Sequence, residues 1–136
     1  MRRMLLSVEN LRVVYRKKGQ VPVEAVRGVS FSVAAGASFG IVGESGCGKS
    51  SLAKTVIGLH KPAGGKITFE GVDTALMTAA EFSRYRRSVQ MVFQDAVGSL
   101  NPRMTVRQTL EEVLRVHRLT AGNDIKVRVM ELLDLV

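Results

Sequence analysis

The stretch Gly43-Glu44-Ser45-Gly46-Cys47-Gly48-Lys49-Ser50 carries the strongest local signal in this 136-residue sequence. It matches the pattern of a phosphate-binding loop, in which a glycine and four variable residues precede Gly-Lys-Ser or Gly-Lys-Thr. The loop follows the apolar run Phe39-Gly40-Ile41-Val42 and opens an amphipathic helix expected over residues 49–59. A strand, a loop and a helix in this order form the context that the motif requires. The stretch therefore predicts an α/β fold that binds a nucleoside triphosphate.

Backbone amides make most of the contacts between such a loop and its anion. Gly43, Gly46 and Gly48 can adopt conformations that a Cβ atom would forbid, and they leave room for phosphate oxygens. The helix that begins at Lys49 adds free N–H groups and the positive end of its dipole. We therefore expect all residues of the stretch 43–50 to line the nucleotide site.

Polar side chains complete the predicted site. Lys49 would reach the β and γ phosphates, and the hydroxyl of Ser50 would bind Mg²⁺. Ser51 could donate a hydrogen bond to a further phosphate oxygen. Cys47 lies beside the helix start and Lys49, so its thiol is expected to react with alkylating agents unless bound nucleotide covers it.

The composition is that of a soluble globular chain in a reducing compartment. Twenty Lys and Arg residues against twelve Asp and Glu give a net charge of +8, but only residues 16–18 and 84–87 form basic clusters. Short basic runs are usually solvated surface, so we do not expect a nucleic-acid partner. The single cysteine cannot form an internal disulfide, and no apolar run has the length of a membrane span. We expect a cytosolic location.

Apolar periodicity outside the loop predicts an antiparallel β layer, a central strand and then helices. Short β-branched runs between glycine turns predict strands over residues 5–8, 11–15, 21–26, 29–33 and 37–42, with later strands over residues 66–70 and 89–93. Residues 94–102 show no periodicity and are expected to form a loop.

Capping patterns predict where the later helices begin. Thr78 precedes Glu81 by three residues and Thr105 precedes Gln108 by three, so helices are expected over residues 78–87 and 105–118. A last helix is expected from about residue 123. No stop signal follows its final apolar residues, so we expect the sequence to be truncated within this helix.

Three further segments carry a family resemblance: Leu11-Arg12-Val13-Val14-Tyr15, Val89-Gln90-Met91-Val92-Phe93-Gln94-Asp95 and Ser99-Leu100-Asn101-Pro102-Arg103-Met104-Thr105-Val106. Together with the loop they resemble the ATP-binding subunit of an ABC transporter, in the oligopeptide, dipeptide or nickel importer branch. The resemblance implies the phosphate-loop core of an ABC ATPase, with an N-terminal antiparallel β layer, over residues 1–104. Residues 105–136 would be the first part of the helical subdomain.

The resemblance also implies roles for individual residues. Tyr15 matches the aromatic residue that stacks on adenine, which suits a flat ring. Gln94 matches the glutamine that contacts Mg²⁺ or the attacking water, so Lys49 and Gln94 would be the catalytic residues of this chain. Residues 99–105 would lie on the surface that meets the coupling helix of a membrane subunit.

The implied activity is hydrolysis of MgATP to drive import of peptides or a similar small solute. The implied partners are transmembrane permease subunits and a second ATP-binding subunit in a head-to-tail dimer. The protein would lie in the cytoplasm, held on the inner face of the membrane through the permease subunits.

The sequence also departs from the family pattern. Ala96 and Val97 stand where the family usually has a proline and often an aromatic residue, and Ser51 replaces a commoner threonine. The sequence contains no Leu-Ser-Gly-Gly-Gln signature and no apolar strand ending in Asp-Glu, and His60 and His117 do not match the switch histidine. We expect this portion alone to bind nucleotide weakly and to hydrolyse it hardly at all.

Two alternatives remain open. A small GTPase shares the loop, and Asp95-Ala96-Val97-Gly98 has the form Asp-x-x-Gly, but no Asn-Lys-x-Asp motif for guanine is present. The other alternative is a fragment that binds nucleotide without hydrolysing it. A comparison of the affinities for ATP and GTP would separate the GTPase from the ATP-binding subunit. The sequence encoded directly downstream would show whether the second alternative holds.

Overall fold

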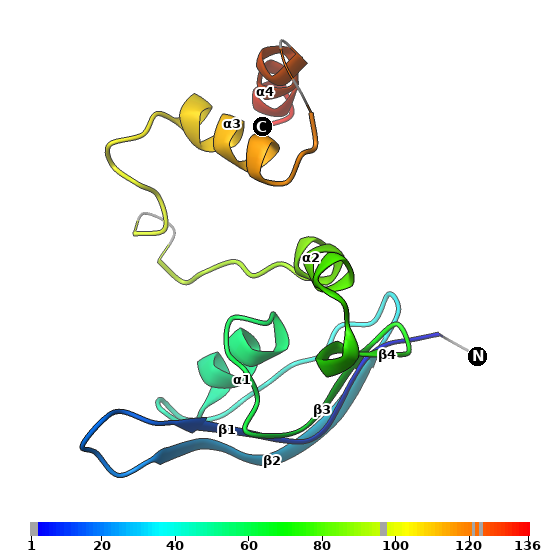
Figure 1. The fold of residues 1–136 in the computed structure, drawn as a ribbon, viewed down its shortest axis with the longest axis vertical. Helices are drawn as coiled ribbons and strands as arrows, with labels where there is room; N and C mark the ends of the chain where they lie inside the picture. The colour runs from blue at the N-terminus through cyan, green and yellow to red at the C-terminus, as the bar shows by residue number, and fades with distance from the viewer. Residues whose placement is uncertain (1–2, 96–97, 121, 123) are drawn as a thin grey trace. The chain divides into compact units, whose positions relative to one another are not determined.

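A computed structural model describes residues 3–95, 98–120, 122 and 124–136. The chain divides into two compact units, Met1–Met91 and Val92–Val136. In chain order the elements are β1 (Met4–Tyr15), β2 (Val23–Ala34), α1 (Lys49–Val56), β3 (Gly64–Phe69), β4 (Val72–Asp73), the 3-10 helix η1 (Thr74–Leu76), α2 (Ala79–Ser88), α3 (Val106–Val116) and α4 (Asp124–Asp134) (Figure 1). The expected assignment of residues 1–104 to the nucleotide-binding core and of residues 105–136 to the helical subdomain stays a prediction.

The N-terminal unit is built on an antiparallel sheet with the strand order β2-β1-β3-β4. The antiparallel β layer is therefore confirmed, but four of its expected strands were wrong in their bounds. Residues 5–8 and 11–15 belong to one strand, β1, and residues 21–26 and 29–33 fall largely on β2. The expected break between residues 8 and 11 is a bulge within β1. There Asn10 takes a φ of 46°, and its N–H donates to Ser30 Oγ at 2.8 Å.

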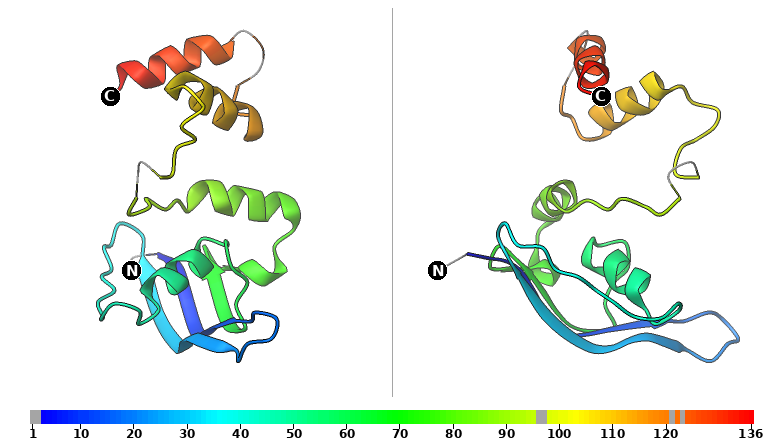
Figure 2. Two further views of the ribbon diagram at one scale, coloured as in Figure 1. Left: turned by 90° about the vertical axis from the view of Figure 1, so that its left-hand side faces the viewer. Right: turned by 180° about the vertical axis from the view of Figure 1, so that it is seen from behind.

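The core of this unit lies between the sheet and α1, which covers one face of it (Figure 2). Apolar residues alternate along the strands, as a half-buried sheet requires, and Leu52 of α1 packs onto them. The buried residues of this core are Val8, Leu11, Val13, Val26, Leu52 and Ile67.

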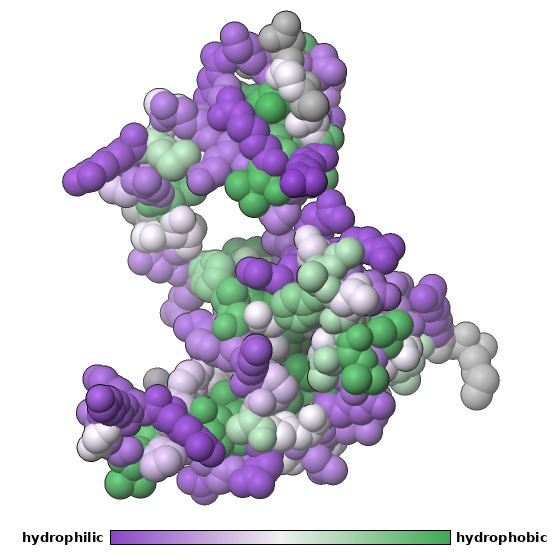
Figure 3. Space-filling view, in the orientation of Figure 1, coloured by the Kyte–Doolittle hydropathy of each residue, from purple (hydrophilic) through white to green (hydrophobic). Residues whose placement is uncertain are grey.

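Two expected strands, over residues 37–42 and 89–93, are not strands in the structure. Neither segment has a hydrogen-bonded neighbouring strand among the residues that the structure describes, and without a ladder a β-rich sequence forms no sheet. Val42 and Val92 are each 95% exposed, although a central strand would bury such residues. Figure 3 shows that hydrophobic side chains reach the surface of both units.

The expected capping box at Thr78 is confirmed at the start of α2. Thr78 Oγ1 accepts from the N–H of Glu81, and the carboxylate of Glu81 accepts from the N–H of Thr78 at 2.8 Å. The hydrogen bonds from the Thr78 N–H and hydroxyl lower the pKa of Glu81. The helix after the phosphate-loop motif ends at Val56, earlier than the expected residue 59, and Gly58 follows with a φ of 78°.

Tyr85 anchors α2 to the rest of the N-terminal unit. Its ring is 3% exposed and meets the ring of Phe69 edge-on at 5.1 Å between centroids. Its hydroxyl donates to the carbonyl oxygen of Val56 at the end of α1. Burial raises the pKa of Tyr85 to about 12.

We expect this phenol to make the folded state sensitive to alkali. The pKa of Tyr85 is higher in the folded state than its unfolded value of 10.0. The stabilising contribution of the neutral phenol to the free energy of unfolding is therefore complete below pH 10, and it is lost as the pH rises toward about 12. The loss should reach about 2 kcal/mol in urea unfolding. Tyr85→Phe should remove this part of the pH dependence, at a cost of about 1 kcal/mol at neutral pH. Tyr15→Phe, at a more exposed tyrosine, is the control. If the unfolding free energy of both variants fell equally with rising pH above pH 10, the alkaline sensitivity would not come from Tyr85.

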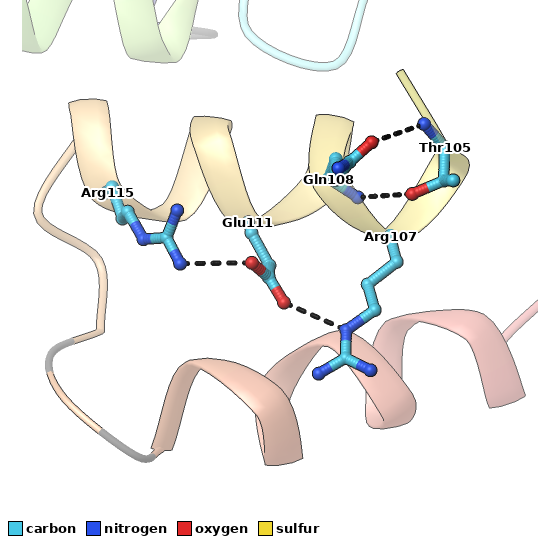
Figure 4. A network of polar contacts seen from close by, with 5 residues as sticks. All are labelled: Thr105, Arg107, Gln108, Glu111 and Arg115. Atoms are coloured by element: carbon cyan, nitrogen blue, oxygen red, sulfur yellow. Dashed lines mark hydrogen bonds and ion pairs between the residues drawn. The ribbon is translucent and has the colours of Figure 1, made fainter. Parts of the chain in front are cut away.

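The C-terminal unit is a helical hairpin in which α3 packs against α4. Its core consists of Leu114, Ile125 and Val129. The expected capping box at Thr105 is confirmed, because Thr105 Oγ1 accepts from the N–H of Gln108 and the Gln108 side chain accepts from the N–H of Thr105 (Figure 4). Asn123, the expected start of the last helix, lies outside the described residues.

One carboxylate on α3 joins two arginines of the same helix. Glu111 accepts from Arg107 at 2.9 Å and from Arg115 at 3.0 Å (Figure 4). The hydrogen bond from Arg107 lowers the pKa of Glu111, with a further contribution from Arg115. Across the described parts of the two units, no helix has both the length and the apolar character needed to cross a membrane.

Candidate phosphate-binding site

The phosphate-loop motif forms a turn that leads directly into α1. Gly48 is the N-cap of this helix and has a φ of 99°, which a residue with a side chain rarely adopts. A Cβ atom at Gly48 would also press against the carbonyl oxygen of Ala25 on β2. The loop therefore lies directly against the sheet at this point, and only glycine fits.

Gly46 and Gly43 shape the other side of the turn. Gly46 has a φ of 81°, and the space beside it is open. Gly43 faces the side chain of Cys47, which a Cβ atom at position 43 would displace. The N–H of Cys47 donates to the carbonyl of Glu44 at 3.3 Å and closes the turn.

Lys49 folds back over the loop that it terminates. Its ammonium donates to the carbonyl oxygens of Gly43 and Glu44, each at 2.6 Å, and lies 3.5 Å from the sulfur of Cys47. Among the described residues no carboxylate pairs with this ammonium. The positive charge is thus held at the loop without a countercharge, where an anionic ligand would supply one.

The rest of the loop surface is open to ligand. Residues 43–47 are exposed, as is Ser50 in the first turn of α1. No N-cap side chain occupies the free amides of α1, because the N-cap is a glycine. Backbone N–H groups, a helix N-terminus and an unpaired ammonium at one place fit the triphosphate of a nucleotide, and the Ser50 hydroxyl fits Mg²⁺ held between protein and phosphates.

Tyr15, at the end of β1, lies beside this loop. Its hydroxyl donates to Oγ of Ser51, the residue that follows the motif, at 3.1 Å. Its ring meets the ring of His60 at 5.3 Å between centroids with an interplanar angle of 89°. The structure therefore brings Tyr15, Ser51 and the loop together, and it adds His60, which the sequence pattern did not assign to the site.

Gln94 belongs to the other compact unit. It is exposed and lies in an irregular segment between Met91 and α3. Beside it, the side chain of Asp95 accepts from the N–H of Gly98 at 2.8 Å. Ala96 and Val97, two of the departures from the family pattern, lie outside the described residues. The roles of Gln94 in binding Mg²⁺ and in catalysis, and of residues 99–105 as a docking surface, stay predictions.

Within the part of the chain that the structure describes, no group of three or more His, Cys, Asp or Glu side chains could hold a metal ion. Mg²⁺ that binds together with a nucleotide usually takes one or two protein oxygens, substrate phosphates and water as its ligands, so it does not require such a group.

Comparison with known proteins gives a consistent result. Residues 26–136 match the family described as ABC transporter. The chain is 40% identical over 138 residues to the putative oligopeptide transport ATP-binding protein YkfD of Bacillus subtilis, covering 100% of this chain and 42% of that protein. It is 41% identical over 137 residues to the oligopeptide transport ATP-binding protein OppF of Salmonella typhimurium, covering 94% of this chain and 41% of that protein. The chain thus spans less than half the length of these curated relatives.

Solved structures support the same relationship. The dimeric structure of the ATP-binding cassette MJ0796 in a post-hydrolysis state, bound to ADP and Pi, superimposes with a TM-score of 0.73 at 26% identity. The match covers 96% of this chain and 56% of that one. An ATP-binding subunit of an ABC transporter matches with a TM-score of 0.64 at 28% identity, covering 85% of this chain and 44% of the other.

Proposed function

Because this chain belongs to the ABC transporter family, we propose that it binds MgATP through residues 43–50, as part of the energy-coupling subunit of an importer for oligopeptides or a similar small solute. The observation that carries the proposal is the uncompensated ammonium of Lys49, held over the loop by the carbonyls of Gly43 and Glu44. The ammonium is thus already held at the loop where the phosphates would bind.

The residues of the loop would act mainly by position and charge. In phosphoryl transfer the protein orients the reacting groups and neutralises the charge that develops on the transferring phosphoryl group. Lys49 and the first amides of α1 would supply that neutralisation. Mg²⁺, when bound, would supply further positive charge, and the Ser50 hydroxyl is the group that would hold it. Gln94 is the residue to which the family resemblance assigns contact with Mg²⁺ or the attacking water.

The proposed partners follow from the relatives. OppF is named an oligopeptide transport ATP-binding protein and the MJ0796 cassette is described as dimeric. We therefore propose permease subunits and a second ATP-binding subunit as partners. The protein would lie on the cytoplasmic face of the membrane, held there by the permease.

The nucleotide preference distinguishes the proposal from a small GTPase. We expect calorimetric titration to show that MgATP binds at least as tightly as MgGTP, because the sequence has no motif for guanine and the Tyr15 ring can stack on either purine. Tyr15→Ala should weaken both nucleotides, while Tyr85→Phe, a change outside the site, should leave both affinities unaltered. Tighter binding of MgGTP would support the GTPase alternative instead.

Hydrolysis is the second point on which the alternatives differ. The sequence contains no signature motif and no Asp-Glu strand end, so the expected catalytic carboxylate is missing from these residues. We propose that the 136-residue chain binds nucleotide without appreciable turnover and that the complete protein hydrolyses it. Phosphate release by the chain alone at rates of about 1 s⁻¹ or more, in the usual range for enzymes, would contradict this.

A further inference from the structure

The ring of Tyr15 is fixed at two points, and both belong to α1 and the turn that follows it. Its hydroxyl donates to Ser51 Oγ in the first turn of the helix. Its ring stands perpendicular to His60 just beyond the helix end, at 5.3 Å between ring centroids. Such edge-to-face contacts between aromatic rings contribute about 0.5 to 1.5 kcal/mol beyond the area that they bury.

The backbone around His60 is held in place independently of Tyr15. The N–H groups of Leu59 and His60 both point to the carbonyl of Lys54, at 2.9 and 3.3 Å, and Gly58 permits this turn with its positive φ. A Cβ atom at Gly58 would press on the ring of Phe82, so the turn is also packed from outside. The backbone that carries His60 is therefore fixed, and the residue is half-buried.

Tyr15 lies at the end of the β1–β2 pairing, where its partner is Val23. It is the last residue of β1, and the turn that follows over residues 16–22 is exposed. The residue is 39% exposed, so part of its ring remains available for a second flat ring. A perpendicular neighbour such as His60 can cover one face of the tyrosine at most.

We propose that His60 is a positioning residue for the nucleobase: it orients the Tyr15 ring so that a heteroaromatic base can stack on the free surface while the phosphates occupy the loop. This inference rests on the proposed nucleotide function, and it adds a residue that no part of the phosphate-loop pattern specifies. The Tyr15 hydroxyl links the base platform to Ser51, so the base and phosphate ends of the site are joined through one hydrogen bond.

The test compares a ligand that carries the nucleoside with one that lacks it. Magnesium tripolyphosphate carries the phosphates without a base, and MgATP carries both. In the full 136-residue chain we expect His60→Ala to weaken MgATP about fivefold and to leave tripolyphosphate within about twofold of wild type. His60→Phe, which retains a ring at that position, should restore MgATP binding to within about twofold. His117→Ala, which alters the other histidine, is the matched control and should change neither affinity.

Each remaining outcome has a defined meaning. Equal weakening of both ligands by His60→Ala, no weakening at all, or failure of Phe to restore binding would overturn the proposal. If His60→Ala does not fold, His60→Gln applies the same comparison with a polar side chain. A wild-type chain that binds neither ligand would refute the proposed function and this inference together. If Tyr15→Ala leaves MgATP binding unchanged while tripolyphosphate still binds, only the base platform is refuted.

Discussion

Lys49→Ala is expected to weaken MgATP binding by at least about 100-fold while leaving the fold intact. The ammonium faces two backbone carbonyls of its own loop and has no carboxylate partner among the described residues, so its charge serves the ligand and not the core. Charge-assisted hydrogen bonds contribute about 1.5 to 3 kcal/mol each, and Lys49 would make more than one with the phosphates. The affinity is measured by calorimetry and the fold by thermal unfolding.

Lys54→Ala is the matched control for this change. Lys54 lies in the last turn of the same helix, away from the N-terminal amides, and its removal should alter affinity less than about twofold. The unfolding free energy of Lys49→Ala should stay within about 1 kcal/mol of wild type, because the two hydrogen bonds that it removes lie at an exposed loop where water can replace them. Wild-type affinity in Lys49→Ala would remove the basis of the phosphate-loop assignment.

Gly48→Ala should have the largest effect on the loop itself. The new Cβ would meet the carbonyl oxygen of Ala25, which belongs to the sheet and cannot move easily. The φ of 99° adds a second cost, because side-chain residues rarely adopt it. We expect a loss of about 3 kcal/mol in unfolding free energy and a loss of MgATP binding of more than about tenfold.

Substitutions at two other glycines separate the cost of the steric contact from the cost of the positive φ. Gly46 has a φ of 81° but open space around it, so Gly46→Ala measures the backbone conformation alone, at about 1 kcal/mol. Gly40 has open space and no positive φ, so Gly40→Ala should be nearly neutral. If Gly48→Ala were as mild as Gly40→Ala, the loop would not pack against β2 as described.

Local signals in the sequence predicted local structure well. Both capping boxes formed as expected, because each depends on a Thr and an acidic or amide side chain three residues apart. The antiparallel layer and the loop before α1 were also predicted correctly. The break in β1 was not, because the strand continues through a bulge that depends on the neighbouring strand and on Ser30.

Features that depend on distant parts of the chain were predicted less well. The apolar run at residues 37–42 reads as a strand, but a strand forms only where a neighbour completes its hydrogen bonds. The contact between Tyr15 and His60 joins two segments that are far apart in sequence, and no periodicity links them. The short β4 and η1 carry too few residues to produce a recognisable pattern.

The most direct test of the central claim uses the single cysteine of the chain. Cys47 is exposed and lies in the loop, so the rate of its alkylation by a maleimide reports on this site alone. If MgATP occupies residues 43–50, saturating nucleotide should slow labelling of the folded protein at least about tenfold, while Lys49→Ala should be labelled equally fast with and without nucleotide. Equal labelling rates in the wild-type chain with and without saturating MgATP would contradict the account.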